Sequence, residues 1–349
     1  MLQLLLGGSG SGKTTLLYQR IRPRAEKGEK SILLVPEQFT SSTEGRIYRE
    51  LGDALSGMVE SFSFTSLAEK ILSTEGGAAV QTLSDAGRAV LVRRALEELQ
   101  DNVHYYHRHR RSAAFCQMAA QTIDELKSAG LSGRQLAQLA GACGAESGKL
   151  SELALIFQGY ETLLARSGMD PSDRLELAGA RLEEALARHS LPEFLRDRAV
   201  FIDEFDTFNA PKKRLLGAML AALPSVTVAL CDDGAPLLSG DLSLFSGAKQ
   251  VAAQLRQLAR KNGAEVAVPQ LLRKDLRHRN APGLAAVAEL LETGSCTADA
   301  PAGEVRLYAA PSREEEARAA AGAIRRLMRQ GVRCGKIAVV CRDIAKYRA

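Results

Sequence analysis

The sequence predicts an α/β protein with a parallel sheet and a large block of helices inserted into it. A strand-like apolar run at residues 2–6 leads through a glycine-rich loop into a helical stretch, and a second apolar run follows at 32–35. From about residue 84 to 189, apolar residues recur every three or four positions, which is typical of helices. Strand-like runs return at 199–202 and 226–231. Strands that alternate with helices favour a parallel sheet, so the long block between them is predicted to be an insertion.

Length and composition indicate a folded protein of more than one domain. A chain of 349 residues is longer than one typical domain, so about two are expected. The hydrophobic share of 46% and the charged share of 25% are ordinary for globular proteins and exclude a disordered, collagen-like or coiled-coil architecture. No apolar run approaches the ~18 residues of a membrane span, and residues 2–6 do not resemble a signal peptide. We therefore expect no membrane association and a cytoplasmic location.

Cysteine spacing and net charge add little on their own. The six cysteines are mostly far apart and show no metal-ligand spacing, so reduced thiols are expected. A net charge of +5 is small for this length, and it only weakly favours polyanionic partners.

The glycine-rich loop carries the most specific motif. Residues 7–14 spell GGSGSGKT, which matches G-x-x-x-x-G-K-[ST] directly after a strand and at the start of a helix. In this motif backbone N–H groups surround phosphates, the lysine (Lys13) contacts the β and γ phosphates, and the hydroxyl of Thr14 binds Mg²⁺. The alternative, a turn that binds nothing, does not explain why pattern and context agree. The residues predicted to bind ATP are Gly7, Gly8, Ser9, Gly10, Ser11, Gly12, Lys13, Thr14 and Thr15.

Two acidic residues follow the strand at 199–202. Asp203 is predicted to hold Mg²⁺, and Glu204 to deprotonate the attacking water; Glu204 and Lys13 are the predicted catalytic residues. The alternative is that these acids cap the next helix. A second acidic strand end, Asp232–Asp233, is less specific and favours a turn or cap.

The order of these elements predicts a RecA-like P-loop NTPase core of the superfamily 1 helicase type. Asp203 lies further from Lys13 than a compact nucleotide kinase or a small GTPase requires, so an all-helical insertion must separate them. The helix from Lys13 is expected to be interrupted at Pro23. Beyond a linker-like stretch, VRLYAA, a helix and KIAVVC predict a strand-helix-strand unit, the truncated start of a second RecA-like domain. The expected domains are 1–80 with 195–292 (ATP-binding), 81–194 (helical insertion), 293–303 (linker) and 304–349 (second domain).

Several segments together resemble the B subunit of bacterial AddAB-type (RexAB-type) helicase-nucleases, over essentially the whole chain. Besides GGSGSGKTTLL they are LLVPEQFTSSTE (33–44), VESFSFTSLAEKIL (59–72), IDEFDTFNAPKKRLL (202–216) and VRLYAAPSREEEARAAAGAIRRL. The resemblance implies ATP and Mg²⁺ as cofactors, and action on double-strand break ends in recombinational repair. It also implies two partners, DNA (single-stranded or a duplex end) and an AddA-type motor subunit. Family members continue into a nuclease domain with an iron–sulfur cluster, and no such cluster is expected in this portion.

Two departures from related motors bear on activity. UvrD-type helicases carry a glutamine at the position of Asp206, and another in a segment that corresponds here to DDGAPLLSGDLSLF. The resemblance therefore implies a helicase-like scaffold that binds ATP and helps to hold DNA. Two alternatives stay open: a scaffold that never hydrolyses ATP, and a P-loop phosphotransferase in which the insertion acts as a lid.

Basic residues outside the loop supply further candidates. Residues 104–111, HYYHRHRR, interleave aromatic and basic side chains as strand-tracking surfaces do, although a solvated loop is an equal alternative. Arg277 or Arg279 resembles the arginine that reaches the γ phosphate, against a surface role. Arg88, Arg93 and Arg94 are expected on the wet face of a helix. The candidate DNA contacts are Tyr105, Tyr106, Arg108, Arg110 and Arg111.

Overall fold

The computed structural model describes residues 1–77, 81–144, 147–295 and 304–347. Its contacts divide the chain into two compact units, Met1–Arg277 and His278–Ala349. The division falls earlier in the chain than the linker expected at 293–303, most of which lies outside the described residues.

The first unit contains a parallel sheet of six strands, so the expected α/β class is confirmed. The strand order is β3-β2-β4-β5-β1-β6, and β2 and β4 are buried along their whole length, as strands covered on both faces must be. The carboxyl ends of β1, β4 and β5 therefore meet at one edge. The strands are β1 Leu2–Gly7, β2 Ser31–Leu34, β3 Val59–Phe62, β4 Ala199–Ile202, β5 Ser225–Cys231 and β6 Gln270–Leu272.

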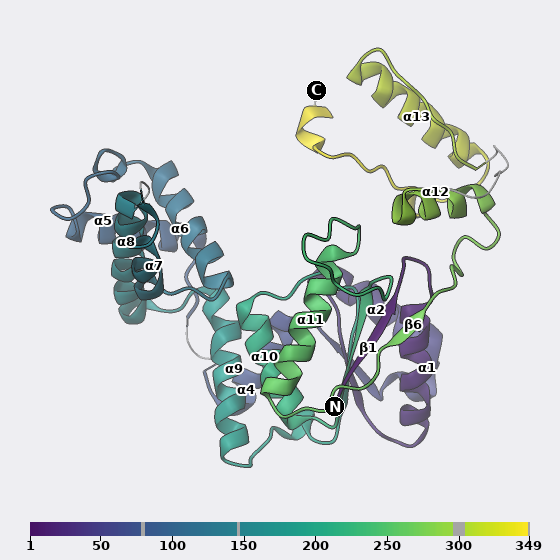
Figure 1. The fold of residues 1–349 in the computed structure, drawn as a ribbon, viewed down its shortest axis with the longest axis horizontal. Coiled ribbons are helices and arrows are strands. Elements are labelled where there is room, and N and C mark those ends of the chain that lie inside the picture. Colours follow the sequence, from purple (N-terminus) through teal and green to yellow (C-terminus); the bar gives the residue numbers. More distant parts are fainter. Residues whose placement is uncertain (78–80, 145–146, 296–303, 348–349) are drawn as a thin grey trace. The chain divides into compact units, whose positions relative to one another are not determined.

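Helices cover both faces of this sheet, with α9, α10 and α11 on one side and α1 on the other (Figure 1). Successive strand residues point to opposite faces, so Leu4 belongs to one core cluster and Leu5 to the other. One face is packed by α1 Lys13–Glu26, η1 Glu37–Phe39, α2 Thr40–Leu51 and α3 Asp53–Ser56, and the other by α4 Phe64–Glu75, α9 Pro171–Ala187, η4 Glu193–Leu195, α10 Ala210–Ala222 and α11 Ser246–Lys261.

Helix α1 continues through Pro23, so the interruption expected there is wrong. Pro23 is exposed and lies in the last turn of the helix, so few helical hydrogen bonds follow the one that proline removes. Ile21 and Ala25 are buried on either side of it, and their packing holds the turn in helical form.

A second hydrophobic core lies within the helical block. Residues from Leu91 to Leu164, mostly on α5, α6, α7 and α8, form this cluster, whereas α9 packs against α4 and α10 in the core of the sheet. The block expected at 81–194 thus divides between two cores. The helices of the block before α9 are α5 Asp85–Glu98, η2 His107–His109, α6 Ala113–Ser128, α7 Gly133–Ala140 and α8 Ser147–Ser167.

The two chain segments that enter and leave this block run side by side. Thr82 pairs with Met169 in a parallel bridge. The N–H of Leu83 donates to the carbonyl of Met169, and the N–H of Met169 donates to the carbonyl of Gln81, each at 3.0 Å. The block therefore begins and ends at neighbouring points.

The second unit holds helices α12 Pro282–Thr293 and α13 Arg313–Arg329, with short turns η5 Cys334–Lys336 and η6 Ile344–Tyr347. The strands expected in VRLYAA and KIAVVC are wrong, since the described part of 304–347 contains none. Leu307 and Val340 are 100% and 92% exposed, so no neighbouring strand or helix buries the apolar residues that suggested strands. Within the described residues of either unit, no helix is long and apolar enough to cross a membrane.

Candidate nucleotide site

The loop between β1 and α1 has a backbone that requires glycine. Gly10 and Gly12 have φ angles of 80° and 90°, in the left-handed region that favours glycine. A Cβ atom on Gly7 would lie 2.4 Å from the hydroxyl oxygen of Ser11 and 2.7 Å from the carbonyl oxygen of Leu272. The glycine spacing of the motif thus reflects the space and dihedral angles of this turn.

Lys13 lies inside the loop that precedes it. Its Nζ donates to the carbonyl oxygens of Gly7 and Gly8, at 2.7 and 2.8 Å. Burial lowers the pKa of the Lys13 ammonium, while the neighbouring Cys231 and the Asp203 carboxylate act in the opposite direction. A cation therefore lies beside the amino end of α1, where unpaired backbone N–H groups favour an anion.

Asp203 lies opposite Lys13 at the end of β4 and is only 5% exposed. Burial raises the pKa of its carboxyl group, and hydrogen bonds from the Thr14 hydroxyl and the Glu204 N–H lower it. The latter bond measures 3.0 Å. The two residues expected to hold Mg²⁺, Thr14 and Asp203, are therefore in contact.

Glu204 has a φ angle of 65°, a conformation that a side chain with a Cβ rarely adopts. Burial and the neighbouring Asp203 charge both raise the pKa of its carboxyl group. Strain of this kind costs about 1–2 kcal/mol and concentrates at functional sites. Glu204 is not the cap of the next helix, because α10 starts at Ala210 with Asn209 as its cap.

These groups line one cavity of about 480 Å³. Three of its residues, Arg46, Leu276 and Cys231, carry no signal in the sequence that marks them for such a site. The guanidinium of Arg46 lies 5.6 Å from the centre of the Tyr18 ring, and its charge lowers the pKa of both Asp203 and Glu204. Nothing local marks Arg46, because a basic residue on an amphipathic helix usually faces water.

Segment 275–277 lies across the outside of the glycine loop. The N–H of Leu276 donates to the carbonyl of Gly10 at 3.0 Å, and Nη1 of Arg277 donates to the Ser9 hydroxyl at 3.1 Å. The Arg277 charge lowers the pKa of Lys13 and Glu204. Of the two candidate arginines, Arg277 lines the cavity, whereas Arg279 belongs to the second compact unit.

A second cavity, of about 450 Å³, shares Glu204, Phe205 and Asp206 with the first. Lys212 lies at its wall, with Nζ 5.6 Å from the Phe64 ring centre and 5.5 Å from that of Phe205. Its other polar lining residues are Glu37, Gln38, Ser63, Thr65, Ser172, Thr207 and Asn209. Asp206 thus lines both cavities.

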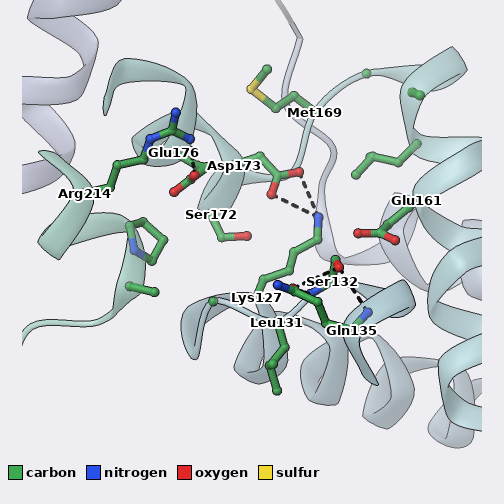
Figure 2. A pocket seen from close by; sticks show the side chains of 16 residues that line it. Lys127, Leu131, Ser132, Gln135, Glu161, Met169, Ser172, Asp173, Glu176 and Arg214 are labelled. Atoms are coloured by element: carbon green, nitrogen blue, oxygen red, sulfur yellow. Dashed lines mark hydrogen bonds and ion pairs between the residues drawn. The ribbon is translucent and has the colours of Figure 1, made fainter. Parts of the chain in front are cut away.

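A third cavity, of about 560 Å³, lies between the helical block and α10 (Figure 2). Lys127 points toward the Asp173 carboxylate there, with Nζ 2.8 Å from it. The same Nζ lies 2.6 Å from Asp170. The hydroxyl of Tyr160 donates to Asp170 at 2.5 Å, and Nε of Arg88 lies 3.3 Å from the same carboxylate. The charged groups pair with one another, so we call them the junction network (Arg88, Lys127, Tyr160, Asp170 with Asp173) and assign it to structure.

The expectation that Arg88 lies on a wet face is wrong. Arg88 is 9% exposed, and its Nη2 donates to the Ala120 carbonyl at 3.2 Å. Its partner Asp170 lies far along the chain, so no local pattern predicts the burial. Arg93 and Arg94 are exposed, as expected, and pair with Glu97 and Glu98.

The aspartates after β5 form turns. Asp232 accepts the N–H of Gly234 at 2.7 Å, and Asp233 accepts the N–H of Ala235 at 2.8 Å. The turn interpretation of this strand end is therefore confirmed.

Comparison with known proteins gives one consistent family. The family model described as "ADDB, N-terminal" matches residues 4–288. The chain is 34% identical, over 99% of its length, to the B subunit of the ATP-dependent helicase/deoxyribonuclease of Desulforudis audaxviator, and 33% and 32% identical over 99% to those of Symbiobacterium thermophilum and Moorella thermoacetica. It spans only 30–31% of the length of these curated relatives.

Proposed function

Because this chain belongs to the AddB N-terminal family, we propose that it is the RecA-like, ATP-binding part of the B subunit of a helicase/deoxyribonuclease. The observation that carries the proposal is the convergence of the glycine loop, Lys13 and the Thr14–Asp203 pair on one cavity. Its volume, about 480 Å³, is in the range of small-molecule sites.

Each side chain has a task that its position supports. Backbone N–H groups at the start of α1 and the Lys13 ammonium bind the phosphates, and Lys13 exchanges its bonds to two loop carbonyls for them. Thr14 and Asp203 would hold Mg²⁺, which when bound neutralises charge on the β and γ phosphates. Arg46 and Arg277 line the same cavity and add positive charge near the γ phosphate.

Glu204 is the candidate general base for hydrolysis. Its carboxylate lines the nucleotide cavity, and its raised pKa brings it closer to the range in which a carboxylate accepts a proton at neutral pH. Asp206 supports a second version of the proposal, a scaffold that binds ATP without turnover. It places a carboxylate, rather than the glutamine of related motors, at the boundary of both cavities.

We extend the proposal to DNA and a partner protein. The relatives are named as B subunits of a helicase/deoxyribonuclease, which implies DNA as substrate and at least one other subunit. The proposed role is in the repair of double-strand break ends by recombination, with an AddA-type motor subunit as the partner.

Titration of a fluorescent ATP analogue into the chain, with and without Mg²⁺, tests the proposal. Saturable, Mg²⁺-strengthened binding is expected, and absence of binding by a folded chain would overturn it. Phosphate release, measured with and without single-stranded DNA, then decides between ATPase and scaffold. In the ATPase version Glu204→Gln removes turnover and leaves binding unchanged. In the scaffold version the unsubstituted chain already shows none.

A further inference from the structure

The segment between α5 and α6 is a basic loop, defined here as residues 103–111. A buried carboxylate fixes its first half. Glu152 on α8 is 7% exposed and accepts the backbone N–H groups of His104, Tyr105 and Tyr106 at 2.8–3.2 Å. A carboxylate that accepts several backbone N–H groups holds a turn tightly. The basic loop therefore has a defined shape instead of that of an unstructured solvated connection.

The loop separates its two tyrosines. Tyr106 turns inward and stacks on Phe115, with ring centres 5.3 Å apart, against the core of the helical block. Tyr105 turns outward and is 57% exposed. Lys149 lies 5.9 Å from the centre of the Tyr105 ring, and Gly148 leaves room for that ring, since a Cβ there would come within 3.3 Å of it. Tyr106 thus packs on the core of the helical block, whereas Tyr105 is an exposed aromatic side chain beside α8.

The same loop carries three arginines. Arg108 and Arg111 are exposed, and Arg110 is half-buried. Over the residues that the structure describes, none of the three arginines forms an ion pair within the chain. Exposed Arg93 and Arg94, on the preceding helix, are by contrast each paired with a glutamate. The charge of the basic loop is therefore available to an outside anion.

From this arrangement we propose that the basic loop, with Tyr105, Arg108, Arg111 and Lys149, binds single-stranded nucleic acid. A single strand presents both phosphates for the arginines and unpaired bases that can stack on Tyr105. A duplex hides its bases and would use the arginines alone. The inference rests on the proposed DNA function and locates one contact of that function on the helical block. It excludes Tyr106, which the sequence pattern alone cannot distinguish from Tyr105.

Anisotropy titrations of a labelled oligothymidylate with the full chain, in a series of salt concentrations, test this. Tyr105→Ala is expected to weaken binding between about fivefold and a hundredfold without changing the salt slope, and Tyr105→Phe to restore it. Arg108→Ala with Arg111→Ala is expected to lower the salt slope by about 0.7 for each lost phosphate contact. The matched control, Arg93→Ala with Arg94→Ala, removes the same charge from exposed, paired sites and should leave affinity within twofold.

Three outcomes overturn the inference. They are an unsubstituted chain that does not bind the oligonucleotide, loop variants that bind like the control pair, and a Tyr105→Ala variant that binds like wild type while the arginine pair fails. The last result would assign the loop to duplex backbone or to another polyanion. Binding of the ATP analogue is measured on the same preparations. A chain that binds nucleotide but shows one of these outcomes loses only the loop assignment, whereas loss of nucleotide binding in the unsubstituted chain contradicts the proposed function itself.

Discussion

Two largely buried lysines of this protein, Lys13 and Lys127, have opposite electrostatic environments. Burial lowers the pKa of Lys13, whose Nζ donates to the carbonyls of Gly7 and Gly8. Burial also acts against the charge of Lys127, but its hydrogen bonds to Asp170 and Asp173 outweigh that effect and raise its pKa. The dipoles of two carbonyl groups bind the Lys13 ammonium, whereas two carboxylates bind the Lys127 ammonium.

The difference distinguishes the candidate binding site from a structural network. In the junction network each charge is answered by another charge of the chain, so nothing is left for a ligand. In the nucleotide cavity Lys13 and Asp203 line the same space without an ion pair between them, and the carboxylate is destabilised by burial. Unpaired charged groups in a cavity lower the free energy of unfolding. A ligand with complementary charges binds there and raises it again.

The largest effect is expected at the junction. Lys127→Met leaves Asp170 and Asp173 without their cation and should lower the free energy of unfolding by about 3–5 kcal/mol, as removal of one partner from a buried pair does. Urea denaturation measures it. Adding Asp170→Asn to Lys127→Met should recover part of the loss, and a single variant as stable as wild type would contradict the structural role of the network.

The same substitution at the nucleotide site should act on affinity instead. Lys13→Met is expected to weaken binding of an ATP analogue at least a hundredfold, about 2.7 kcal/mol, because no other ammonium group can take its place in the loop. The unfolding free energy should stay near that of wild type, since only bonds to loop carbonyls are lost. Isothermal titration and urea denaturation of one preparation give both numbers. Equal losses of stability in Lys13→Met and Lys127→Met would remove the distinction between the two regions.

Asp203→Asn should stabilise the nucleotide-free protein, on the order of 1 kcal/mol at neutral pH, and remove the Mg²⁺ dependence of nucleotide binding. Burial raises the pKa of Asp203 above its ordinary 3.8, so the folded state binds this proton more tightly than the unfolded state. Ionisation at neutral pH therefore costs stability. This cost starts to shrink once the pH falls below the raised pKa, and it is gone below the ordinary value of 3.8. The advantage of the variant should accordingly be largest at neutral pH and shrink toward acid. Thermal unfolding across pH measures this, and an advantage independent of pH would point to a cause other than charge.

The smallest effect is expected at an exposed pair. Arg93→Gln breaks the contact with Glu97 on α5, where both side chains are 55% exposed, and should cost at most about 0.5 kcal/mol. Thermal unfolding of this variant gives the baseline for the junction substitutions. A loss comparable to that of Lys127→Met would show that burial is not what distinguishes the charges.

The sequence is most informative where chemistry and local structure coincide. The glycine spacing of residues 7–12 encodes one turn, and Asp203 follows an unbroken apolar strand, so the sequence alone indicates both the sheet edge and the candidate nucleotide site. It is least informative where a residue's neighbour is distant in the chain. In the sequence, Arg88 cannot be distinguished from an exposed basic residue on an amphipathic helix, because its partner Asp170 is distant in the chain. The same holds for Arg46, which comes close to Asp203 only when α2 packs near β4. The apolar runs after residue 304 have strand composition, but a strand also needs a neighbour, which composition does not report.

The bridge between Thr82 and Met169 has an evolutionary consequence. The polypeptide leaves the α/β domain and returns to it at neighbouring positions. The helical excursion between these two positions has a hydrophobic core of its own. Modules attached in this way can be lengthened or exchanged without shifting a strand of the host, provided that Arg88 and Lys127 stay to pair with Asp170 and Asp173. Selection could therefore have remodelled what the excursion touches, including the basic loop at 103–111, while the turn around Lys13 was left alone.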